Sequence, residues 1–101
     1  FQGSRGIENL QSFDLLDGTI LYGTSSGSHV FVGPGSTTGI DVTELQLLNL
    51  VFNDTVETYR TATIEPAEFW GFDNLGRIEV GALPSFILTP ENPLLSIDNI
   101  V

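Results

Sequence analysis

The longest dense apolar run in the sequence is Leu45-Gln46-Leu47-Leu48-Asn49-Leu50-Val51-Phe52, and the alternating segment Val56-Glu57-Thr58-Tyr59 follows it closely. Thr43-Glu44, just before the run, could begin a helix, and Leu45, Leu48 and Phe52 have helical spacing. The β-branched and aromatic residues later in the region favour a strand instead. We therefore predict a strand over residues 47–59, bent at Asn53-Asp54, which the other segments pair with or cover.

Shorter apolar segments on both sides of this run also have the composition of strands. Phe13-Asp14-Leu15-Leu16 and Thr19-Ile20-Leu21-Tyr22 flank Asp17-Gly18, which predicts a hairpin because Gly accepts the positive φ of a tight turn. Further strands are predicted at residues 29–32, 69–72, 77–80 and 86–88, with a Gly-rich loop at 33–39. Turn signals every ~8–12 residues indicate an all-β fold, a small barrel of short antiparallel strands.

A weak internal similarity keeps a second architecture open. Leu16-Asp17 matches Ile64-Glu65, and Tyr22-Gly23 matches Trp70-Gly71 at the same separation. A true duplication would make the chain a two-unit β-sandwich rather than one barrel. Residues 1–4 look like the remnant of a purification tag, so we expect a single small β domain over residues 5–101.

The charge balance limits the classes of partner. Thirteen acidic residues against three Arg and no Lys give a formal net charge of -10. Binding a nucleic acid needs clustered cations, so the balance works against it and favours basic protein partners or cations. Cys is absent, which excludes disulfides and thiolate ligands but leaves the localisation unknown. No apolar run reaches the ~18 residues of a membrane span.

No segment carries a convincing catalytic or metal-binding motif. Asp17-Gly18-Thr19 differs in order from the Asp-Thr-Gly of aspartic proteases, so we interpret it as a turn. His29 is the only His and no G-x-S-x-G frames a nucleophile. The Gly-rich segment 33–39 lacks the Lys of a phosphate-binding loop. We therefore predict no catalytic residues, no metal site, no cofactor and no enzyme activity.

Three further features have a functional and a structural interpretation. Asn53-Asp54-Thr55 is a formal glycosylation sequon. Carboxylates near turns, such as Asp54 and Glu57, could bind calcium weakly but are typical of solvated turns. Phe69, Trp70 and Phe72 could form a stacking platform for bases or sugars. We favour the interpretation that one face of this aromatic segment belongs to the core.

Three segments together resemble the Sm and Sm-like (LSm) family of small β-barrels. They are residues 13–23, 48–57 and 75–80, and the resemblance implies an Sm-like or SH3-like barrel that assembles by pairing edge strands between neighbours. It also implies that Asn49 contacts an RNA base, with Arg77 nearby. The chain departs from the family by a long insertion at 24–43 and by Gly81-Ala82 where the family has Arg-Gly.

The function predicted from the sequence is therefore a non-enzymatic protein-interaction or assembly module that uses exposed strand edges. Leu48, Leu50 and Phe52 are the predicted interface, and the partner is another protein or a second copy of the chain. One alternative is an Sm-like RNA-binding ring subunit that uses Asn49 and Arg77. The other is an extracellular β-domain that binds calcium or carbohydrate.

Overall fold

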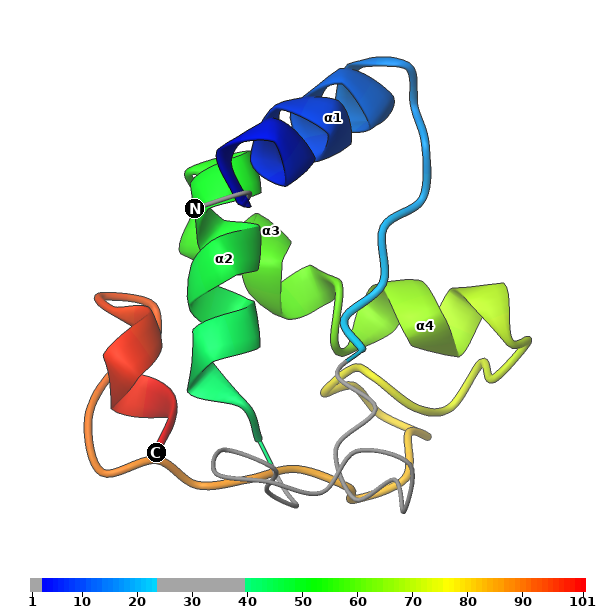
Figure 1. Ribbon diagram of the computed structural model, residues 1–101. Coiled ribbons are helices and arrows are strands. Elements are labelled where there is room, and N and C mark those ends of the chain that lie inside the picture. The colour runs from blue at the N-terminus through cyan, green and yellow to red at the C-terminus, as the bar shows by residue number, and fades with distance from the viewer. Residues whose placement is uncertain (1–2, 24–39) are drawn as a thin grey trace, which may run out of the picture.

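The chain is organised around one helix at its centre. A computed structural model describes residues 3–23 and 40–101 (Figure 1). The described elements are α1 (Gly3–Leu15), α2 (Val42–Phe52), α3 (Thr55–Arg60), α4 (Ile64–Phe69) and the 3-10 helix η1 (Ile97–Ile100). Helix α2 contacts α1, α3 and η1. Figure 1 shows α1 lying across the C-terminal end of α2, with η1 beside its N-terminal half.

Helix α2 is fixed at both ends by polar residues of its own sequence. The Asp41 side chain accepts a hydrogen bond from the Glu44 N–H at 3.2 Å, which satisfies one of the free N–H groups of the first turn. At the other end Asn53 adopts the left-handed conformation with φ 52° and donates its N–H to the Asn49 carbonyl at 2.7 Å. The capping residues Asp41 and Asn53 therefore define where α2 begins and ends.

The predicted strand over residues 47–59 is wrong, because this region forms α2 and α3. Leu45, Leu48 and Val51 are the buried residues of α2, and they recur every three positions on one face of a helix. The chain does turn at Asn53-Asp54, but the turn separates two helices. Asp54 accepts hydrogen bonds from the N–H groups of the first turn of α3, at 2.8 and 3.3 Å.

The predicted hairpin at Asp17-Gly18 is also wrong, since this pair ends α1. The Gly18 N–H donates to the Phe13 carbonyl at 2.9 Å and the Asp17 N–H to the Asp14 carbonyl at 3.0 Å, which is the Schellman pattern. Asp17 has φ 62°, in the left-handed region that this pattern requires. Asp17-Gly18 does form a turn, but an Asp-Gly pair is compatible with the C-terminus of a helix as well as with a hairpin.

The all-β fold, the Sm-like or SH3-like barrel and the two-unit sandwich are not supported. Residues 3–23 and 40–101 contain no strand. The segment 69–72 is the end of α4 followed by a turn, 77–80 is a series of bends and turns, and 86–88 belongs to no helix, turn or strand. The resemblance to the Sm-like family therefore fails. The predictions at 29–32 and 33–39 lie outside the described residues, and α1 begins within the predicted tag remnant.

The core is small and lies around α2. Among the described residues, the buried apolar side chains are Leu45, Leu48, Val51, Ala67 and Ile97. Hydrogen bonds hold the C-terminal segment against this core: the Tyr59 hydroxyl donates to the Pro93 carbonyl and the Thr55 hydroxyl to the Leu94 carbonyl, both at 2.8 Å. Burial also raises the pKa of the Tyr59 phenol. Polar contacts thus supplement the limited apolar packing.

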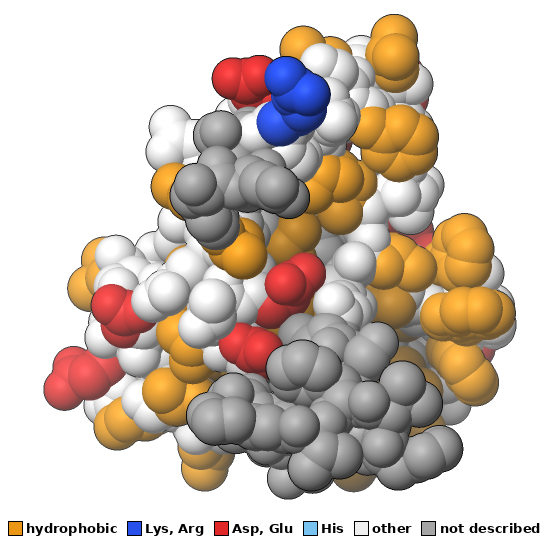
Figure 2. All heavy atoms as spheres, viewed as in Figure 1, with side chains coloured by type: hydrophobic (Ala, Val, Ile, Leu, Met, Phe, Trp, Pro, Cys, Tyr) orange, Lys and Arg blue, Asp and Glu red, His pale blue; other side chains and the backbone are white. Residues whose placement is uncertain are grey.

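Many large apolar side chains lie outside this core. Eleven of them, all in residues 69–95, are exposed and together are called the apolar surface below: Phe69, Trp70, Phe72, Ile78, Val80, Leu83, Phe86, Ile87, Leu88, Leu94 and Leu95. Figure 2 shows part of this surface, where apolar side chains gather over the far end of α4. None of the helices described is both long and apolar enough to cross a bilayer.

Candidate functional site

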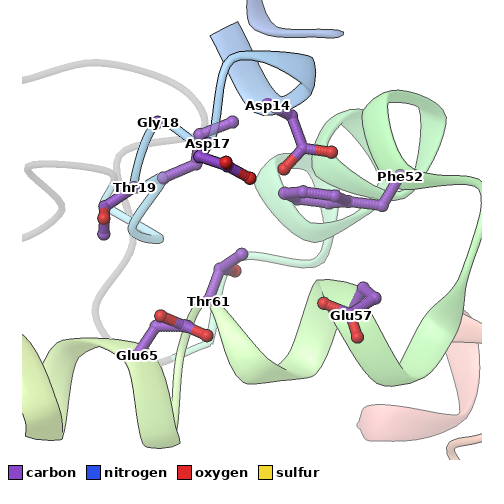
Figure 3. Close-up of a pocket in the computed structure, with 9 residues that line it drawn as sticks. Asp14, Asp17, Gly18, Thr19, Phe52, Glu57, Thr61 and Glu65 are labelled. Carbon is purple, nitrogen blue, oxygen red and sulfur yellow. The ribbon is translucent and has the colours of Figure 1, made fainter.

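A concave site lined by carboxylates lies where the end of α1 meets α3 and α4. It has a volume of about 210 Å³ and is called the acidic hollow (Figure 3). Asp14 comes from α1, Asp17 from the turn after it, Glu57 from α3 and Glu65 from α4. The remaining lining residues are Gly18, Thr19, Ile20, Phe52 and Thr61.

Local hydrogen bonds place these carboxylates. The Schellman turn holds Asp17 at the end of α1, and the Asp54 cap sets the start of α3, whose first turn carries Glu57. Tyr22 connects the two sides of the hollow. Its N–H donates to the Thr61 carbonyl at 2.9 Å, and its hydroxyl accepts from the Asp41 N–H at 2.8 Å. The segment after α1 is thereby tied both to the α3–α4 corner and to the start of α2.

The acidic hollow has the charge of a cation-attracting surface, and two of its polar side chains, those of Thr61 and Glu65, are engaged within the fold. The Thr61 hydroxyl donates to the Thr58 carbonyl at 2.6 Å, so it is engaged within the fold. Glu65 forms an ion pair with Arg60 at 3.5 Å. Among the described residues no three His, Cys, Asp or Glu side chains converge as metal ligands. The hollow can contribute an electrostatic preference for a basic surface, because its several carboxylates leave a negative potential.

An apolar groove lies on the other side of the α3–α4 corner. It has a volume of about 470 Å³ and is lined by Ala62, Thr63, Gly76, Arg77, Ile78, Ser85, Phe86 and Ile87. An adjoining hollow of about 320 Å³ shares four of these residues and reaches Phe72 and Leu75. Three groove residues, Ile78, Phe86 and Ile87, belong to the apolar surface. The groove therefore gives that surface a concave part.

A further hollow, of about 240 Å³, lies between α1 and α2. Ile7 and Leu10 line it from α1, and Leu47, Leu48 and Val51 from α2. Glu44 also lines it, and desolvation by burial, followed by the nearby Asp41 charge, raises the pKa of its carboxyl group. The Gln11 amide donates to the Leu50 carbonyl at 3.2 Å, so α1 is docked partly by a polar contact.

The three predicted interface residues lie in different surroundings. Leu48 is only 4% exposed and belongs to the core, whereas Leu50 is 59% exposed. Phe52 is half-buried and its ring lies in the acidic hollow (Figure 3). A strand would have put these alternate residues on one face, but a helix disperses them. Their role in an interface stays a prediction, with Leu50 the one among them that a partner could reach directly.

The two residues of the RNA alternative are engaged elsewhere in the fold. The Asn49 side-chain oxygen lies 3.0 Å from the hydroxyl of the fully buried Thr58, so Asn49 links α2 to α3. Arg77 lies between Glu68 at 3.9 Å and Glu79 at 3.8 Å. Each residue therefore has a structural role, and the RNA function, which depended on the Sm-like resemblance, loses its basis.

Sequence reasoning misjudged the aromatic segment and did not find the acidic hollow. Phe69, Trp70 and Phe72 are all exposed, so the expected core face is wrong. The Phe69 and Trp70 rings form an edge-to-face pair with centroids 5.0 Å apart. The carboxylates of the hollow come from three helices that a strand prediction cannot bring together, and no local motif marks them.

Comparison with known proteins adds no assignment. No family model matches the sequence, and no curated protein and no solved structure is significantly similar to it.

Proposed function

We propose that this chain is a non-enzymatic protein-interaction and assembly module that contacts other protein molecules through the apolar surface of residues 69–95. The observation that carries the proposal is the exposure of eleven large apolar side chains in that segment, against a core of five buried ones in the described residues. Extensive exposed apolar surface is uncommon on proteins that act alone, and it marks sites of interaction.

The energy at stake supports this interpretation. Fully burying one Val, Leu, Ile or Phe side chain contributes about 1.5–3 kcal/mol relative to leaving it in water. Ile78, Val80 and Leu88 are each more than 90% exposed, so their packing contributes almost nothing to the fold of one molecule. Burial against a partner would recover that free energy, offset by the loss of translational and rotational freedom on association.

Charge defines the partners that suit this surface. Acidic residues border the apolar residues at Glu68, Glu79 and Glu91. Arg77, the Arg within this part of the chain, lies between two carboxylates. These carboxylates repel the phosphates of a nucleic acid. They favour binding to a protein whose contact surface is apolar and whose surrounding residues are neutral or basic.

The test separates side chains that stabilise the fold from those that serve assembly. In the variant Ile78→Ser/Val80→Ser we expect the free energy of unfolding in urea to stay within about 0.5 kcal/mol of the parent, because both side chains lie in solvent. We also expect weaker association in sedimentation equilibrium. Leu45→Ala is the core control and should cost about 2–5 kcal/mol. A loss above about 1 kcal/mol per substitution in the double variant would show that these residues pack in the protein's own core, which contradicts the proposal.

A further inference from the structure

One segment of the apolar surface has the properties of an unpaired strand. Residues 86–89 belong to no helix, strand or turn, and Phe86, Ile87 and Leu88 are three consecutive exposed apolar residues within them. Aromatic and β-branched residues favour the extended conformation, and Thr89 follows in the same pattern. Pro84 and Pro90 flank the segment on its two sides.

The backbone groups of residues 86–89 have no hydrogen-bond partner in the described part of the chain. The Ser85 N–H donates to the Leu83 carbonyl at 2.8 Å, but within residues 3–23 and 40–101 no backbone hydrogen bond is made by residues 86–89. Such a row of N–H and C=O groups is a template for pairing with another extended chain.

The charge distribution shows which chain fits. The eleven residues between Glu79 and Glu91 carry no charge, although the whole protein carries a net charge of -10. Two copies can therefore approach one another along this segment at a lower electrostatic cost than along charged parts of the chain. A segment of about six residues with high β-propensity, no charge and no internal Pro is typical of self-pairing strands.

We propose, building on the assembly function above, that residues 85–89 pair antiparallel with the same residues of a second copy of the chain. Centred on Ile87, this register places Phe86 opposite Leu88 and Ser85 opposite Thr89, so the same contacts occur twice about a twofold axis. It also places Glu91 opposite Leu83 rather than opposite another carboxylate. A parallel in-register pair would instead place Glu79 and Glu91 next to their own copies, and like charges directly opposite destabilise a pair of strands.

The apolar groove gives the pairing a place for a side chain. Phe86 and Leu88 lie on the same side of an extended backbone, because side chains alternate with a period of two. Phe86 lines the groove, so Leu88 of the second copy, lying opposite it, reaches the mouth of the groove. In the free molecule Leu88 is 91% exposed. This residue therefore gains the most burial on pairing.

The two prolines set the length of the ladder. In the Ile87-centred register Pro84 lies opposite Pro90 at each end, and neither has an N–H to donate. The ladder stops after five residues on each chain. The interface is consequently small, and the dimer is expected to be weak and dependent on concentration.

Sedimentation equilibrium from about 10 µM to about 1 mM tests the pairing, with amide I infrared spectra recorded across the same range. The test variants are Leu88→Lys, which adds a charge at the pairing face, and Ile87→Pro, which removes the central N–H. The matched control is Leu95→Lys, because Leu95 is 80% exposed on the same apolar surface but lies outside the segment. Urea unfolding of each variant confirms that its fold is retained.

We expect the parent protein to dimerise with a growing antiparallel-sheet signal. Leu88→Lys and Ile87→Pro should weaken the dimer by about tenfold or more, and Leu95→Lys by less than about twofold. A parent that stays monomeric to about 1 mM overturns the pairing. Equal effects of Leu88→Lys and Leu95→Lys on the dimer also overturn the pairing. They would indicate association through the apolar surface in general, which is compatible with the assembly function. The assembly function itself fails on a different measurement, the loss of stability in Ile78→Ser/Val80→Ser.

Discussion

Replacing Leu48 and Leu50 separately by Ala tests how residues 42–52 are folded. The two side chains are identical and only two positions apart on α2. Leu48 is 4% exposed and Leu50 is 59% exposed. On a strand, positions two apart face the same side, so the two substitutions would have similar costs. On a helix they face in directions about 200° apart, so the costs should differ strongly.

The magnitude follows from the burial of each side chain. Removing a buried Leu side chain loses its transfer free energy and leaves a cavity, and the total cost is about 2–5 kcal/mol. At Leu50 most of the side chain is already in water, and Ala is the better helix former, so the expected change is within about 0.5 kcal/mol. A domain of this length has a total stability of about 5–15 kcal/mol, so Leu48→Ala removes a large share of it.

The assay is urea unfolding followed by far-ultraviolet circular dichroism, with the two variants compared at equal concentration. We expect the transition midpoint of Leu48→Ala to fall well below that of Leu50→Ala, with similar slopes for the two variants. If both variants lose the same free energy, the helical arrangement of α2 is refuted. A larger loss for Leu50→Ala than for Leu48→Ala would refute it as well.

Three further substitutions test the helix ends and the α1–α2 hollow. Gly18→Ala should cost about 1 kcal/mol in thermal unfolding, because a Cβ at this position overlaps the Phe13 ring and forces it to move; an unchanged melting temperature would contradict the close packing of the Phe13 ring on Gly18. Asp54→Ala should cost about 0.5–2 kcal/mol, because it removes the cap of the short helix α3, and Asp54→Asn should recover most of that loss. Burial raises the pKa of Glu44 above its ordinary 4.5, so the folded state binds this proton more tightly and ionisation destabilises it as the pH rises through that window. Glu44→Gln should therefore be more stable than the parent at about pH 7, with the difference vanishing towards about pH 4, and a constant difference would refute the shift.

The turns of this protein were visible in the sequence, but their structural type was not. Asp17-Gly18 was predicted as a hairpin turn and Asn53-Asp54 as a bend within a strand, and the chain does change direction at both places. The first ends α1 and the second separates α2 from α3. Such residues tolerate the left-handed conformation in hairpins and in helix C-caps alike, so the pair alone does not decide between the two.

The central apolar run shows why the class of the fold was missed. An eight-residue run with six apolar residues is compatible with a buried strand and with a buried helix, because periodicity cannot separate the two at this length. The deciding signals were the polar residues at its ends, Asp41 before Thr43-Glu44 and Asn53 after Phe52. These are short-range capping signals. The prediction gave more weight to the β-propensity of Leu50-Val51-Phe52, which misled it because β-propensity depends strongly on context.

The apolar surface is the part of the molecule where composition misleads most. Ile78 and Leu88 lie in apolar segments that predicted strands at 77–80 and 86–88, yet both side chains are exposed and neither segment forms a strand. The acidic hollow could not be foreseen either, since its carboxylates come from α1, the turn after it, α3 and α4, which only the folded chain brings together.

Amide hydrogen exchange at residues 86–89, measured at low and at high protein concentration, tests whether these residues pair only between two copies of the chain. At low concentration these amides should exchange about as fast as those of an unfolded chain, because no bond within the described residues protects them. At high concentration they should become protected while the amides of α2 stay protected at both. Protection of residues 86–89 at every concentration would contradict the account, since the segment would then belong to the protein's own fold.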